Sequence, residues 1–101
     1  MKEHLQQEFE HRKCFLCERV ETEYNRLEVH HIFQGRGRRQ ISDRYGLTVL
    51  LCHKCHNEPP YGAHQNADVM DYLHRYGQQK MMRDQGWTQE KFIEVFGKNY
   101  L

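Results

Sequence analysis

The sequence contains no long hydrophobic run. A helix needs about 20 consecutive apolar residues to cross a bilayer, and no stretch of this 101-residue chain approaches that length. The N-terminal segment MKEHLQQEFEHRK also lacks the apolar stretch of a signal peptide. We therefore expect no membrane partner and a cytoplasmic location.

Net charge is nearly absent as well. A formal net charge of +1 provides little general attraction for phosphates. Any contact with DNA must therefore be local or assisted by a partner. The chain has no internal repeat and is too short for a large apolar core, so we expect one small domain of the size that a bound metal helps to stabilise.

The sequence does contain four cysteines, arranged as two Cys-x-x-Cys pairs. Cys14 and Cys17 form the first pair, and Cys52 and Cys55 form the second. In a reducing compartment such pairs hold metal more often than they form disulfides. Thiolates three residues apart can bind one zinc ion without backbone strain. The spacing predicts a structural zinc site, with oxidised pairs or inert buried cysteines as the alternative.

Apolar patterning predicts two short strands joined by a loop. Residues 27–33 alternate at first and contain β-branched and aromatic side chains. Residues 47–51 are almost continuously apolar, which predicts a strand buried on both faces. Between them, residues 34–40 contain two glycines and three arginines, and predict a flexible basic loop.

The C-terminal third predicts two helices. Pro59, Pro60 and Gly62 should prevent a regular helix until about Asn66. The first helix is then expected to run to about residue 83, with Gly86 ending it. Thr88 can cap a last helix whose apolar stripe is Phe92, Val95 and Phe96 and which Gly97 closes. Trp87, Phe92 and Phe96 are expected in the core.

Histidines lie close to the predicted metal ligands. His30 and His31 form a doublet in the run VHHI, His56 follows Cys55 directly, and His64 lies eight residues later. Successive strand residues point to opposite faces, so His30 and His31 can share a site only at a strand end, twist or bulge, and we expect an irregular backbone there. His53 and His74 lack a motif partner and are expected at the surface.

In this order, the motifs resemble those of the HNH endonucleases, and most closely the small phage-borne branch related to RecA-dependent recombination-enhancement nucleases. The matching elements are Cys14-x2-Cys17, Val29 to Phe33 followed by Gly35, Leu51 to His56, Gly62 to His64, and Phe92 to Leu101. The resemblance implies an α+β, zinc-stapled ββα-metal fold. The matching elements run from Cys14 to the C-terminus. We expect a single HNH nuclease-like domain over residues 1–101, with an arm over 1–13, a core over 14–64 and C-terminal helices over 65–101.

The resemblance also implies an activity and its residues. His31 would be the general base, and His30, His56 and His64 would hold one catalytic divalent cation (Mg²⁺, Mn²⁺, Ni²⁺ or Zn²⁺). The implied reaction is hydrolysis of DNA phosphodiester bonds with low sequence specificity, in phage recombination or DNA processing in the host cytoplasm. A recombinase filament is an implied partner. The chain departs from the family pattern at Leu47, where the family has an asparagine whose bracing role passes to Asp43 or Thr48, or is absent.

Two alternatives accompany this hypothesis. Five basic residues are candidates for contacts with DNA phosphates: Arg36, Arg38, Arg39, Arg44 and Lys54. The basic loop can equally be a solvated segment without a partner. The whole chain can also be a noncatalytic zinc module that binds nucleic acid or protein, with its histidines packed around the cysteine-bound zinc.

Overall fold

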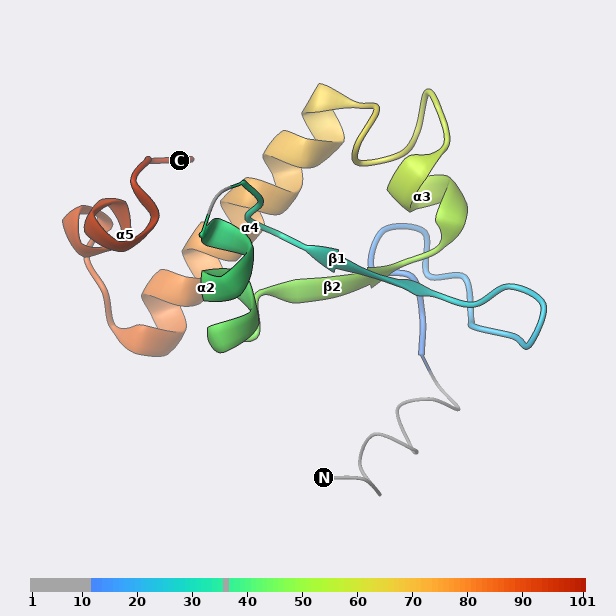
Figure 1. The fold of residues 1–101 in the computed structure, drawn as a ribbon, viewed down its shortest axis with the longest axis horizontal. Coiled ribbons are helices and arrows are strands. Elements are labelled where there is room, and N and C mark those ends of the chain that lie inside the picture. Colours follow the sequence, from blue (N-terminus) through green and yellow to red (C-terminus); the bar gives the residue numbers. More distant parts are fainter. Residues whose placement is uncertain (1–11, 36) are drawn as a thin grey trace, which may run out of the picture. The chain divides into compact units, whose positions relative to one another are not determined.

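The protein is a small α+β molecule with one two-stranded antiparallel sheet, as the computed structural model shows (Figure 1). The structure describes residues 12–35 and 37–101. Strand β1 (Glu28–His31) pairs with β2 (Thr48–Leu51). The predicted α+β class is confirmed. Most of the predicted N-terminal arm, residues 1–11, lies outside the described residues.

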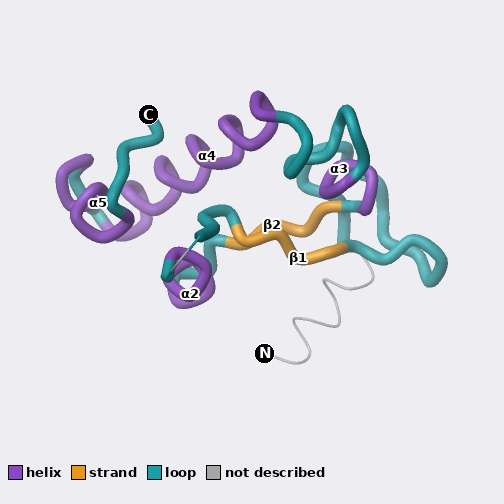
Figure 2. The backbone as a smooth tube through the Cα atoms, turned by 45° about the horizontal axis from the view of Figure 1, so that its top comes forward, coloured by secondary structure: helices purple, strands orange, loops and turns teal. Residues whose placement is uncertain are grey.

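The described chain forms two compact units, whose boundary falls within both strands. The cysteine unit comprises residues 12–30 and Val49–Asn66, and the helical unit comprises His31–Thr48 and Ala67–Leu101. Apart from its strand residues and α3 (His53–Asn57), the cysteine unit is mostly loop and turn (Figure 2). The helical unit contains α2 (Arg38–Arg44), α4 (Ala67–Gln85) and α5 (Gln89–Phe96).

A buried carboxylate organises the loops of the cysteine unit before β1. The side chain of Glu21 is only 2% exposed and lies 3.5 Å from Arg12 Nε and 3.3 Å from Arg26 Nε. It also accepts a hydrogen bond of 2.8 Å from the backbone N–H of Leu27. Burial raises the pKa of Glu21, but these hydrogen bonds and charges lower it overall. The polar segment is therefore fixed by one ionised side chain.

Helix α2 begins within the predicted basic loop and takes up its last three residues, 38–40. The helix starts after Gly37, which has a left-handed φ of 80°. The hydroxyl of Ser42 accepts from the N–H of Phe33 and donates to its carbonyl, each at 3.1 Å. The prediction of a flexible loop was therefore wrong over residues 38–40, because the buried Ser42 within α2 bonds to Phe33 and holds the helix in place.

Two further predictions need correction near the second cysteine pair. Strand β2 is buried on one face only, since Val49 and Leu51 are buried whereas Thr48 and Leu50 are half-buried. Helix α3 was not expected, because Pro59 and Pro60 suggested an irregular segment. The prolines instead end it: Glu58, which precedes Pro59, is extended at φ −88° and ψ 127°.

The two C-terminal helices follow their local sequence signals. Helix α4 ends before Gly86, which has a φ of 66°. The Thr88 side chain accepts a 3.1 Å hydrogen bond from Lys91 N at the start of α5, and Gly97 closes that helix with a φ of 84°. These predicted boundaries are confirmed.

An aromatic cluster forms the core of the helical unit. The Phe33 ring lies 5.6 Å from Phe92 and 4.7 Å from Phe96, and all three side chains are buried. Trp87 is only half-buried, so its predicted core position is wrong. The surface position predicted for His74 is also wrong, because its ring stacks on Phe33 at 5.6 Å and an interplanar angle of 8°.

Candidate metal centres

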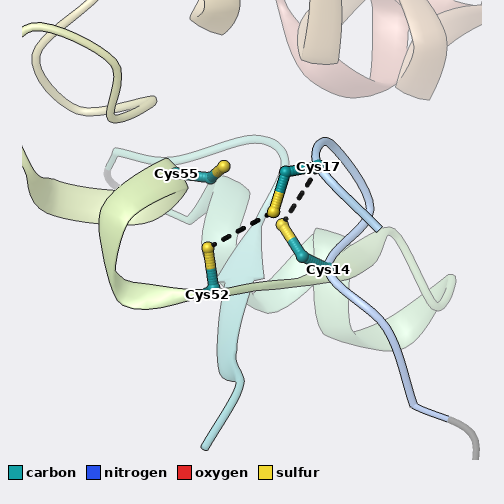
Figure 3. A group of neighbouring side chains, drawn as sticks. All are labelled: Cys14, Cys17, Cys52 and Cys55. Carbon is teal, nitrogen blue, oxygen red and sulfur yellow. Dashed lines mark hydrogen bonds between the residues drawn. The ribbon is translucent and has the colours of Figure 1, made fainter. Parts of the chain in front are cut away.

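The four cysteines meet in one cluster (Figure 3). Cys14 and Cys17 come from the turn between the bridged residues Lys13 and Val20, and Cys52 and Cys55 come from the start of α3. All four sulfurs lie within 4.8 Å of one another, and Cys17 Sγ is 3.7 Å from Cys52 Sγ. Tetrahedral Zn–S bonds of about 2.3 Å would place two sulfurs about 3.8 Å apart. The cluster therefore has the donors and spacing to hold a zinc ion.

Backbone hydrogen bonds give the cluster its shape. The N–H of Phe15 donates to Leu50 O at 2.8 Å, which joins the first turn to β2, and the N–H of Glu18 donates to Cys14 O at 2.9 Å. Glu18 adopts a left-handed φ of 64° where the turn reverses. The second pair follows from the start of α3, where His56 N donates to Cys52 O at 2.9 Å. Both pairs are thus held by the main chain.

The thiols differ in acidity. Burial raises the pKa of Cys14, but backbone N–H groups, chiefly those of Cys17 and Cys52, outweigh burial and lower the pKa to about 7. Burial and the neighbouring thiols raise the pKa of Cys55, and burial raises that of Cys52. One thiolate therefore forms readily, whereas a fully ionised cluster requires a bound cation to offset its charge.

A second cluster contains three histidines of the cysteine unit. His30 comes from β1, His56 from α3, and His64 from the loop that follows. One nitrogen from each ring lies within 4.8 Å of the other two, and His56 Nε2 is 3.0 Å from His64 Nε2. His30 is only 1% exposed. Three imidazole nitrogens that converge in this way can hold a metal ion.

The loop after α3 returns His64 to the cluster. Ala63 N donates to Cys55 O at 2.7 Å, and His64 N donates to His56 O at 3.2 Å. Gly62 permits this path, because a Cβ there would lie 2.7 Å from the backbone nitrogen of Glu58. The eight-residue separation of His56 and His64 is therefore compatible with one site.

Glu28 is a site residue that the sequence reasoning missed. Its Oε1 lies 2.8 Å from His56 Nδ1, and its Oε2 lies 3.2 Å from His53 Nδ1. A carboxylate that accepts a hydrogen bond from one ring nitrogen leaves the lone pair of the other ring nitrogen directed toward a metal. The bond to His56 is the main cause of the lowered pKa of Glu28. Strand alternation could have identified it, because Glu28 and His30 are two residues apart on one face.

The remaining histidines of this unit are His64, which belongs to the cluster, and His53, which lies beside Glu28. Burial, and then the charge of His56, lower the pKa of His64, which favours the neutral ring that binds metals. The His53 side chain is 59% exposed, as predicted, although it shares Glu28 with His56. Its ring nitrogens therefore contact carboxylates, with Glu58 Oε2 at 3.8 Å from Nε2.

His31 has a different neighbour from the three clustered histidines. It is the last residue of β1 and belongs to the helical unit, where its Nε2 lies 2.8 Å from Asp43 Oδ1. The doublet lies at the end of β1, and the chain bends directly after it at Ile32 and Phe33, so the backbone leaves the regular strand at the point where the sequence predicted an irregularity. Asp43, one of the two residues proposed from the sequence for the bracing role, thus contacts the end of β1, and the neighbouring Ser42 adds two hydrogen bonds with Phe33.

The basic candidates occupy different environments. Arg39 and Arg44 are exposed on α2, whereas Arg38 is half-buried and donates from Nε to the carbonyl of Phe96 at 3.1 Å. Lys54 Nζ lies 4.6 Å from the centre of the Tyr61 ring. Arg36 lies outside the described residues. Arg38 thus has a structural contact at the end of α5, and Arg39, Arg44 and Lys54 are the better placed for solvent-side contacts.

Searches for related proteins and for membrane-spanning segments both give negative results. Over residues 12–35 and 37–101, no helix combines the length and the apolar character needed to cross a membrane. Comparisons with family models, with curated proteins and with solved structures each find no match to this chain.

Proposed function

We propose that the protein is a metal-dependent DNA endonuclease of the HNH type, which hydrolyses phosphodiester bonds with low sequence specificity. The observation that carries this proposal is the convergence of His30, His56 and His64, with Glu28 bonded to His56 Nδ1 at 2.8 Å. The motif resemblance adds a role in phage recombination or DNA processing. It also adds a recombinase filament as a partner.

The donor set narrows the choice of cation. Imidazole nitrogens suit zinc and nickel, whereas magnesium prefers oxygen ligands. Three protein ligands leave positions for a phosphate oxygen and water, as in catalytic sites. When bound, a divalent cation there supplies charge stabilisation to the phosphoryl and leaving oxygens. We therefore favour Zn²⁺ or Ni²⁺ over Mg²⁺ among the cations that the sequence left open.

The protein's own groups supply the proton transfer and the substrate contacts. His31 would take a proton from the attacking water, for which a neutral imidazole is suited near pH 7. The water oxygen would bond to phosphorus while the 3′ oxygen leaves in line. Arg39, Arg44 and Lys54 would contact DNA phosphates, which position a duplex without reading its sequence.

A noncatalytic zinc module remains the second candidate, favoured by one observation. The four cysteines supply a complete tetrahedral ligand set without any histidine. In such a module the three histidines would only pack beside the zinc-bound turn. The two candidates differ in cleavage and in the number of metal ions bound.

Nicking of supercoiled plasmid with Zn²⁺, Ni²⁺, Mn²⁺ or Mg²⁺ tests the proposal. The wild-type chain should nick DNA, and His56→Ala should reduce the rate by at least about 100-fold, as expected for loss of a catalytic group. Gln65→Ala is the matched control, since this exposed neighbour of His64 contributes only its backbone to the loop. Equal nicking by His56→Ala and the wild type, or none by the wild type with any cation, contradicts the proposal.

A further inference from the structure

The His31–Asp43 pair lies within the helical unit. The carboxylate and the imidazole share a hydrogen bond of 2.8 Å between Asp43 Oδ1 and His31 Nε2. The His31 side chain is 15% exposed, and that of Asp43 is 64% exposed. The ring is therefore largely enclosed, whereas its carboxylate partner faces solvent.

The backbone around this pair is fixed by neighbouring residues. Ser42, which precedes Asp43, is fully buried and makes two hydrogen bonds of 3.1 Å with the backbone of Phe33. Leu47 N donates to Ser42 O at 2.7 Å, and Gln34 Nε2 donates to His31 O at 3.1 Å. These hydrogen bonds fix the end of β1 relative to the end of α2. They therefore also fix the positions of the His31 and Asp43 side chains.

This geometry selects one tautomer of His31. An ionised carboxylate can only accept hydrogen bonds, so the nitrogen facing Asp43 must carry the proton. The proton of a neutral His31 is then on Nε2, and Nδ1 has the free lone pair. We infer that Asp43 is a positioning residue that holds His31 in this tautomer and so provides Nδ1 as the base for the attacking water.

The inference rests on the proposed function and deepens it by assigning the atom that receives the proton. Water transfers one proton to Nδ1, its oxygen bonds to phosphorus, and the bond to the 3′ oxygen breaks. The imidazolium that results has N–H groups at both nitrogens, and the Asp43 carboxylate stabilises its charge. Asp43 acts through His31 and contacts neither the water nor the DNA.

The experiment compares Asp43→Ala and Asp43→Glu in the zinc-loaded full chain. The alanine variant should lower kcat about 10- to 100-fold, as losses of orienting partners do, while KM stays unchanged. The glutamate variant retains a carboxylate at an exposed position and should recover most of the rate. In ¹⁵N spectra, His31 should carry its proton on Nε2 in the wild type and lose that preference in Asp43→Ala.

Asp84→Ala is the matched control, because it removes an exposed carboxylate that pairs with Lys80 on α4. It should leave both the rate and the His31 tautomer unchanged. An Nδ1–H tautomer in the wild type overturns the inference, as does an unchanged kcat in Asp43→Ala. Failure of the wild type to cleave DNA overturns the proposed function and the role of His31 as a base, whereas the spectra still decide whether Asp43 sets the tautomer.

Discussion

At the residue scale, the ligands were easier to predict than the groups that orient them. Cys-x-x-Cys spacing is a local signal, so Cys14, Cys17, Cys52 and Cys55 could be assigned from the sequence, and the structure brings them together. Glu28 and Asp43 act across 28 and 12 residues, respectively, to reach His56 and His31. Which side chain each carboxylate contacts depends on the fold, so the sequence could offer Asp43 as a bracing residue but could not pair it with His31, and it could not pair Glu28 with His56.

Glu28→Gln should weaken metal binding at the histidine cluster by about 10- to 100-fold, the usual cost of losing an orienting carboxylate. The amide no longer holds His56 Nδ1 through a charged acceptor. Calorimetric titration with Ni²⁺ of protein whose cysteines already hold zinc measures this effect. Glu58→Gln, which changes an exposed carboxylate of the same unit, should bind as the wild type does. Equal affinities for all three proteins would show that Glu28 does not orient the ligand.

The lowered pKa of His74 predicts that the protein loses stability in acid. Burial is the main cause of its lowered pKa, with the charge of Lys98 next, so the folded state favours the neutral ring. The unfolded chain then binds more protons, and stability falls as pH drops below the ordinary value of 6.5 and through the folded pKa. Wild type should therefore lose more stability than His74→Gln between pH 7.5 and 5.5, measured by urea unfolding. A larger loss of stability in His74→Gln than in the wild type would contradict this prediction.

At the element scale, helices with local stop and start signals were predictable, and short helices held by distant residues were not. Thr88 and Gly97 specify α5 from within its own sequence. Helix α2 depends on Ser42 contacting Phe33, nine residues earlier, and α3 has only five residues. Such short segments are marginal without tertiary contacts, so their composition alone suggested loops.

Helix α4 contains a glycine that its packing requires. A Cβ at Gly77 would lie 2.6 Å from Ile32 Cγ2 and 2.9 Å from Phe33 Cε2, both in a buried part of the helical unit. Alanine normally stabilises a helix relative to glycine by about 1 kcal/mol. Here Gly77→Ala should instead destabilise the protein by about 1 to 3 kcal/mol, because overpacking outweighs that gain.

Chemical denaturation measures this change against Gln79→Ala, an exposed substitution on the same helix. The control should stay within about 0.5 kcal/mol of the wild type. Increased stability in Gly77→Ala would mean that the Ile32 and Phe33 side chains move aside for the added methyl group without destabilising the core.

At the scale of the whole molecule, the sequence predicted the α+β class and the four cysteines that cluster, but not the two-unit organisation. Both the cysteine and histidine clusters lie within the cysteine unit, residues 12–30 and 49–66. The aromatic core around Phe33 lies within the helical unit. The alternation of apolar residues reports which side chains are buried, but it does not report which of two cores they join.

The central claim is that the chain has two metal sites with different ligands. Native mass spectrometry of the protein titrated with Zn²⁺ counts the bound ions directly. The account predicts two ions per wild-type chain, and one tightly held ion in His56→Ala, because the four cysteines stay intact. A wild type that binds one ion at saturation, with His56→Ala unchanged, would contradict the histidine site and with it the nuclease proposal.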